Sequence, residues 1–347
     1  MTKNIKKGKI GIGQIAEILN VSKSTVSRAL NNHPKISRET KDKVKQAAIK
    51  LGYTPNIPDL MTPDQAKVIV LIVPEIENSY FREIVNGVHS FYAQQEYEVL
   101  VSIVNNSVDQ VKSILKLSKK LSVSGIILFV FDKALPIEEI IGTNEKTPPF
   151  VFIHQGDNDV VAGKVIPDIF QGVIKATRHL VNNGRSRIAL LLGTPGFTIC
   201  HEMLNGYKAA LQETDSLFSE ELIKYGNAKP TGIKENLNEL FSYADFPDAI
   251  ITQSPIVAFQ TIKFLKDRNL KVPEDVMIVC LGSELYSPLI SPGIASIQLK
   301  GSEIGVDAAR LLLEQIDNPE KPPETIIKPV NFIIKGSAIR VRNSNLK

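Results

Sequence analysis

The chain has 347 residues, a mass of 38.3 kDa and a net charge of +4, with 43% hydrophobic and 22% charged residues. This length predicts two or three domains, and the composition excludes a disordered, collagen-like or disulfide-rich chain. The longest apolar runs, such as residues 68–73, are far shorter than the roughly 20 residues of a bilayer span, so no membrane partner is expected. The basic residues 1–9 lead into no apolar stretch, so we expect no secretory signal and a cytoplasmic location.

Charge is divided unevenly along the chain. Residues 1–56 hold 12 Lys and Arg against 3 Asp and Glu, whereas the remaining 291 residues hold 29 against 34. A basic head on a mildly acidic body indicates a polyanionic partner such as nucleic acid, and a solvated basic tail is the alternative. Helical periodicity within the head favours a folded domain over a tail.

Three short helices are predicted in the head. Apolar residues recur at helical spacing over residues 12–19, and a break at Asn20 and Val21 precedes Ser22, a residue suited to cap a second helix over residues 23–31. Ser37 is suited to cap a third helix that ends at Gly52. A short, polar second helix after a tight turn is typical of a helix-turn-helix that enters the major groove.

A competing motif lies in the first helix. Residues 11–16 match the dinucleotide-binding pattern G-x-G-x-x-G/A, but no apolar strand precedes them. We therefore expect no nucleotide cofactor there.

Three stretches of the head carry a family resemblance: IAE at residues 15–17, VSKSTVSRALN at 21–31 and LGYTPN at 51–56. They resemble the LacI/GalR family of bacterial transcription regulators. The resemblance implies a cytoplasmic, nucleoid-associated homodimer that binds a pseudo-palindromic operator in double-stranded DNA, most simply as a repressor. It assigns base contacts to Lys23, Ser24 and Arg28, and phosphate contacts to Thr25, Ser27 and Asn31. For Thr25, a hydroxyl that faces the turn is the second interpretation.

The linker, residues 57–66, departs from the family pattern. The family places a short hinge helix here, with a Leu that enters the minor groove, whereas this chain has Pro58 and Pro63. Two interpretations stay open. Residues 58–61 form a short helix that offers Leu60 or Met61 to the minor groove, or the prolines make a stiff, extended linker.

The body alternates strand and helix, which predicts an α/β fold of parallel sheets covered by helices. The resemblance implies a periplasmic-binding-protein-like body of two Rossmann-like subdomains. We expect a helix-turn-helix domain at 1–56, the linker at 57–66 and the body at 67–340. Within the body, subdomain one takes about 67–160 and 290–319, and subdomain two takes about 161–289 and 320–340.

A small-molecule effector is predicted between the two halves, where the carboxyl ends of parallel strands meet. Polar and aromatic residues follow these strands in the sequence, among them Glu75, Asn78, Phe131 and Thr194. The predicted effector contacts are Ser79, Tyr80, Phe81, Asn105, His154, Phe197, Met203, Ser254, Gly282 and Leu299.

The polar positions of the family pattern are depleted in this chain. Met203 stands where the family usually has Arg, and Gly282 and His154 stand where it usually has acids. Three interpretations follow: a less polar effector stacked on aromatic rings, a sugar-like effector held by Ser, Asn and His groups, or a degenerate cleft that responds to no small effector. His154 is either an effector contact or a structural histidine.

Enzyme motifs are missing from the sequence. It has no G-x-S-x-G, no P-loop and no H-E-x-x-H, and Cys200 and Cys280 lie far apart without neighbouring metal ligands. We therefore expect no catalytic residues, no cofactor and no metal. A transport-type solute-binding protein shares the body fold, but the basic head argues against it.

Overall fold

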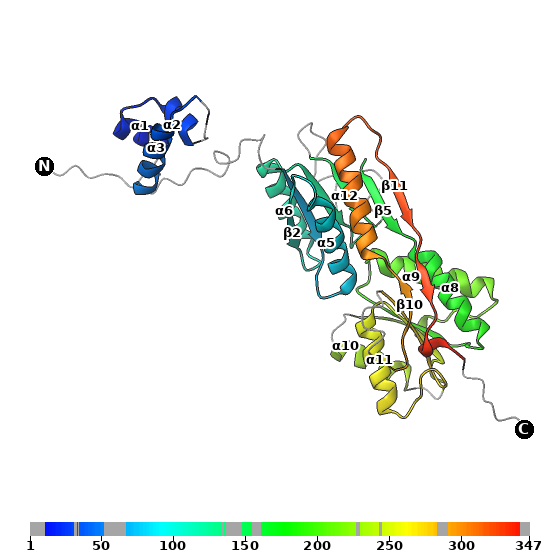
Figure 1. Ribbon diagram of the computed structural model, residues 1–347. Coiled ribbons are helices and arrows are strands. Elements are labelled where there is room, and N and C mark those ends of the chain that lie inside the picture. The colour runs from blue at the N-terminus through cyan, green and yellow to red at the C-terminus, as the bar shows by residue number, and fades with distance from the viewer. Residues whose placement is uncertain are drawn as a thin grey trace, which may run out of the picture. The chain divides into compact units, whose positions relative to one another are not determined.

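The computed structural model describes residues 11–30, 33, 35–51, 67–132, 135, 148–154, 161–226, 230–242, 245–282 and 291–340. They belong to two compact units, a helical head within the first 67 residues and an α/β body that begins at Val68 (Figure 1). The predicted contacts Asn31, Leu60 and Met61 lie outside the described residues. Within the part of the chain that is described, no helix is both long and apolar enough to span a bilayer.

The head contains the three helices that the periodicity predicts: α1 (Ile12–Leu19), α2 (Lys23–Leu30) and α3 (Arg38–Lys50). Both predicted caps are present, because the amide of Thr25 donates to Ser22 Oγ at 3.0 Å and the amide of Thr40 donates to Ser37 Oγ at 3.3 Å. The three helices enclose a small core of Ile15, Ala16, Val26, Ala29, Val44 and Ala48.

The body has two lobes, each with one six-stranded sheet. In lobe one the strand order is β11-β5-β4-β3-β1-β2, and in lobe two it is β12-β10-β9-β8-β6-β7. Neighbouring strands are parallel except for the antiparallel pair β10 and β12. The strands are β1 (Val68–Val73), β2 (Glu98–Ile103), β3 (Gly125–Phe129), β4 (Phe150–Ile153), β5 (Gly163–Pro167), β6 (Ile188–Leu192), β7 (Ile223–Tyr225), β8 (Ala249–Thr252), β9 (Met277–Leu281), β10 (Ala295–Gln298), β11 (Thr325–Lys328) and β12 (Asn331–Ile333).

Amphipathic helices pack against these sheets, as expected for an α/β fold whose strands are buried on both faces. In lobe one, α5 and α12 lie side by side (Figure 1). In lobe two, α8 packs against α9 and α10 against α11. The helices are α5 (Ser79–Tyr92), α6 (Val108–Leu121), α8 (Ile169–Asn182), α9 (Thr198–Glu213), α10 (Pro230–Leu240), α11 (Pro255–Asp267) and α12 (Gly301–Asp317), with short 3-10 turns η1 (Glu220–Leu222) and η3 (Gly336–Ala338).

The chain crosses between the lobes three times, slightly later at each crossing than the sequence analysis predicts. Strands β5 and β11 belong to lobe one, whereas β10 and β12 belong to lobe two. The crossings therefore follow residues 167, 298 and 328, instead of lying near residues 161, 290 and 319. An apolar strand has the same sequence pattern in either sheet, so only the pairing of strands reveals its lobe.

Candidate DNA-reading helix and interlobe cleft

Helix α2 presents a polar face to the outside of the head. Val26 and Ala29 are buried in the head core, whereas Lys23, Ser24 and Arg28 are exposed. All three residues predicted to contact bases therefore lie on the accessible side of the helix. The predicted phosphate contacts Thr25 and Ser27 are half-buried at its margins.

The first turn of α2 is held by a hydroxyl cluster. Ser22 Oγ lies 2.8 Å from Ser24 Oγ and 2.8 Å from Thr25 Oγ1. The Thr25 hydroxyl thus takes part in the turn, as its second interpretation has it, and its phosphate contact stays a prediction. A Cβ atom on Gly13 would lie 3.2 Å from Cε of Lys23, so the lysine stem rests against α1.

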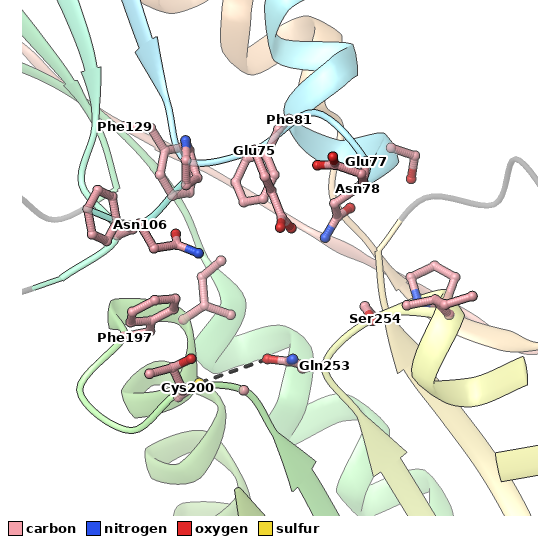
Figure 2. A pocket seen from close by; sticks show the side chains of 18 of the residues that line it. Glu75, Glu77, Asn78, Phe81, Asn106, Phe129, Phe197, Cys200, Gln253 and Ser254 are labelled. Atoms are coloured by element: carbon pink, nitrogen blue, oxygen red, sulfur yellow. Dashed lines mark hydrogen bonds between the residues drawn. The ribbon is translucent and has the colours of Figure 1, made fainter. Parts of the chain in front are cut away.

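The body contains a cavity of about 640 Å³ between its lobes, at the carboxyl ends of strands from both sheets. Figure 2 shows Glu75, Asn78, Phe81 and Asn106 on the lobe-one side, opposite Phe197, Cys200, Gln253 and Ser254 of lobe two. Its size is typical of a small-molecule site. The described lining residues are Pro74, Glu75, Glu77, Asn78, Ser79, Phe81, Asn106, Phe129, Phe131, Gly193, Thr194, Phe197, Ile199, Cys200, Gly226, Gln253, Ser254, Pro255, Ile256 and Phe259.

Four of the predicted effector contacts line this cavity: Ser79, Phe81, Phe197 and Ser254. The strand-end residues Glu75, Asn78, Phe131 and Thr194 line it as well. Their roles toward an effector stay predictions.

The other six predicted contacts are not among the described lining residues. Tyr80, His154, Met203 and Leu299 are buried in the protein interior. At the turn after β2, Asn106 lines the cavity in place of Asn105. Gly282 packs against Pro255, which lines the cavity: a Cβ atom on this glycine would be 2.8 Å from the proline Cδ. The alignment of strand ends identifies the correct edge of each sheet but not the direction of each side chain.

His154 is part of a buried polar contact between the lobes. It follows β4 of lobe one with φ +70°, and its amide donates to the carbonyl of Val165 at 3.0 Å. Its Nε2 shares a hydrogen bond of 3.1 Å with the Tyr80 hydroxyl, and its Nδ1 lies 4.0 Å from Glu202 Oε1 on α9 of lobe two. Burial, with smaller contributions from Glu202 and Glu83, raises the pKa of Tyr80 well above its ordinary value. The geometry fits the structural interpretation of His154.

A backbone contact closes the cleft on one side. The amide of Thr198 donates to the carbonyl of Phe131 at 3.0 Å, and Asp132 forms a β-bridge with Phe197. The rings of Phe131 and Phe197 meet edge-on with their centroids 5.8 Å apart. Phe131 belongs to lobe one and Phe197 to lobe two, so rotation of the lobes would change this contact.

Several lining residues were missed by the sequence analysis, among them Glu77, Asn106, Phe129, Cys200 and Gln253. Phe129 ends β3, Gln253 directly follows β8, and Asn106 lies in the turn after β2, so inspection of every strand end in the sequence would have found them. Burial raises the pKa of the Cys200 thiol to about 11, which leaves it a neutral part of the wall.

No group of three or more His, Cys, Asp or Glu side chains within the described ranges is arranged to hold a metal ion.

A helix-turn-helix head followed by a two-lobed, periplasmic-binding-protein-like α/β body is the architecture of one class of DNA-binding transcription regulators. Residues 12–56 match the family described as bacterial regulatory proteins of the lacI family, and residues 66–336 match the periplasmic binding proteins and sugar binding domain of the LacI family. The chain belongs to the LacI family, and it is a DNA-binding transcription regulator, not an enzyme.

The chain is similar to curated and solved members over nearly its whole length. It is 28% identical to the HTH-type transcriptional repressor PurR of Actinobacillus pleuropneumoniae serotype 3 (strain JL03), over 96% of this chain and 99% of PurR. Its fold matches the regulator CelR in complex with cellobiose (TM-score 0.72, 23% identity, 94% and 99% covered). It also matches the lac repressor dimer bound to operator and the anti-inducer ONPF (TM-score 0.71, 20% identity, 96% and 100% covered).

Proposed function

We propose that this protein is a homodimeric repressor that binds a pseudo-palindromic operator and changes its DNA affinity when a small effector occupies the interlobe cavity. The observation that carries the proposal is the presence, in one chain, of an exposed polar recognition helix and a cavity lined by both lobes. Its action on DNA places the protein in the cytoplasm.

The exposed face of α2 supplies the proposed DNA contacts. Lys23, Ser24 and Arg28 are accessible and carry donors suited to base edges in the major groove. Thr25 and Ser27 lie beside them and are proposed to contact phosphates, as is Asn31. One head reads too few base pairs for genomic specificity, so two heads on a symmetric site are required.

Exposed apolar side chains on β2 support the dimer. This strand forms the edge of the lobe-one sheet, and Leu100, Val101 and Ile103 are 53%, 42% and 40% exposed. An edge strand with three exposed aliphatic side chains favours burial against a second copy of the chain. The lac repressor relative, whose fold this chain shares, is a dimer bound to operator.

The cavity supports the coupling between effector and DNA. Its walls come from both lobes, so a ligand that contacts both stabilises one relative rotation of the lobes over another. If the operator also binds the two rotational states with different affinity, effector binding changes the operator affinity. The coupling free energy between the two sites is typically about 1–3 kcal/mol. PurR is named a repressor, which supports repression by this chain. CelR was solved with cellobiose, which supports a small-molecule effector.

The proposal is tested by selecting operators from a random DNA pool with the full-length protein and by measuring the mass of the complex formed. We expect a two-fold symmetric site and two chains per operator. A complex with one chain, or a selected site without symmetry, would contradict the proposal.

A further inference from the structure

The charged groups that line the interlobe cavity are all acidic among the described residues. Glu75 and Glu77 contribute carboxylates, and the described lining contains no Lys, Arg or His. Glu75 is half-buried, and no described residue forms a hydrogen bond or ion pair with it. In Figure 2 its carboxylate points into the cavity. A partly dehydrated anion of this kind is stabilised by a cation that enters the cavity.

Aromatic rings form the apolar part of the same cavity. Phe81 and Phe129 pack edge-on with their centroids 4.9 Å apart in lobe one, and Phe197 and Phe259 contribute rings from lobe two. The faces of such rings attract organic ammonium groups and also pack against flat apolar groups.

A second polar group in the cavity wall has no hydrogen-bond partner among the residues that the structure describes. Ser254 is only 6% exposed, and its Oγ makes no hydrogen bond, not even to cap α11, which begins at the next residue. Ser254 lies across the cavity from Glu75 (Figure 2). A buried hydroxyl without a partner is destabilising unless a ligand or a water molecule supplies one, and Ser254 belongs to a residue set that lines the cavity, so its hydroxyl is a candidate ligand contact on the lobe-two side.

We propose that the effector is an organic cation, a protonated amine carried on an apolar, ring-sized body. Its ammonium group pairs with Glu75, its body lies among the phenylalanine rings, and a polar group at its other end bonds to Ser254. This inference rests on the proposed function, in which the cavity is the effector site. Such a ligand contacts lobe one through Glu75 and lobe two through Ser254, as the coupling requires.

Plain sugars fit the described lining less well. A sugar buries many hydroxyl groups, and bidentate Arg or Asp partners are the usual means of satisfying them. The described part of the lining instead offers two carboxylates, a few amides and hydroxyls, and five phenylalanine rings.

The inference is tested by calorimetric titration of the full-length protein with three probes. These are 2-phenylethylamine, its neutral analogue 2-phenylethanol, and D-glucose. We expect the amine to bind at least tenfold more tightly than the alcohol, and glucose not to bind at millimolar concentration. Glu75→Gln should remove the preference for the amine, whereas the control Glu320→Gln, at an exposed residue after α12, should keep it.

A pH series gives a second measurement that needs no variant. Burial, and to a lesser extent Glu77, raises the pKa of Glu75, so Glu75 gains a proton as the pH falls through this raised pKa. The other described titratable groups of the lining are Glu77 and Cys200, and the thiol stays neutral below pH 8. We expect amine affinity to fall as the pH is lowered through this raised pKa, while alcohol affinity stays constant.

Failure of this inference can be told apart from failure of the proposed function. Equal binding of amine and alcohol, no amine binding at 10 mM, or an unchanged preference in Glu75→Gln would overturn the cation assignment. Glucose that binds and releases operator DNA would overturn it as well, but would leave the proposed regulation intact. An amine that binds through Glu75 without changing operator affinity would support the assignment and contradict the regulation.

Discussion

Gly282 offers a sharp test of how this cleft differs from the family pattern, which places Asp at this position. The glycine follows β9 with φ +138°, a conformation that side-chain-bearing residues rarely adopt. A Cβ atom here would lie 2.8 Å from Cδ and 3.1 Å from Cγ of Pro255, which begins α11. Gly282→Asp therefore introduces both backbone strain and a steric clash.

The expected loss of stability follows from these two terms. Backbone strain of this kind costs about 1–3 kcal/mol, and overpacking against a fixed ring costs about 1–3 kcal/mol. The sum, about 2–6 kcal/mol, is a large part of a total stability of about 5–15 kcal/mol. For domains of about 150–250 residues, each kcal/mol lowers the Tm by about 2–4 °C, so we expect a decrease of at least about 4 °C.

The assay is thermal unfolding followed by circular dichroism, with a matched control and a double-mutant cycle. Gly184→Asp is the control, because Gly184 has φ +83° but open space around its Cβ position, so it retains strain without a clash. Adding Pro255→Ala to Gly282→Asp should recover part of the loss, since it removes the clashing ring. A Gly282→Asp protein that melts within 1 °C of the wild type would refute this account.

Further predictions concern the head, the dimer and the cleft. Lys23→Ala and Ser24→Ala should change the preferred operator, with about 1–3 kcal/mol lost per base contact, whereas Thr25→Ala should weaken binding to all sequences alike; an unchanged selected site for the first two would contradict their role. Val101→Lys should shift the protein toward monomer in sedimentation without unfolding it, because it places a charge on the exposed β2 edge; an unchanged dimer would remove this strand from the interface. Common mono- and disaccharides at millimolar concentration should neither raise the Tm nor release operator DNA. Met203→Arg should not confer sugar binding, because the residue is fully buried and Gly282 supplies no carboxylate; thermal-shift screening of both proteins decides this, and one tightly bound hexose would contradict it.

The sequence alone determined the head and the class of the body. The helical spacing of Ile15, Ala16 and Leu19, and the capping hydroxyls of Ser22 and Ser37, depend on residues a few positions apart. The alternation of apolar strands with amphipathic helices likewise predicted parallel sheets, because strand burial and helix amphipathicity are properties of single elements.

Tertiary structure decided which strand joins which sheet and which polar residues reach the cleft. Tyr80 and His154 lie at strand and helix ends, as cleft residues do, but their side chains bond to each other in the interior. Ser254 has the same kind of position and lines the cavity, and its Oγ has no hydrogen-bond partner among the described residues. The sequence pattern of a buried polar residue is the same in both cases, because its partner comes from an element far away in the chain. Only the tertiary packing determines whether the chain itself supplies that partner.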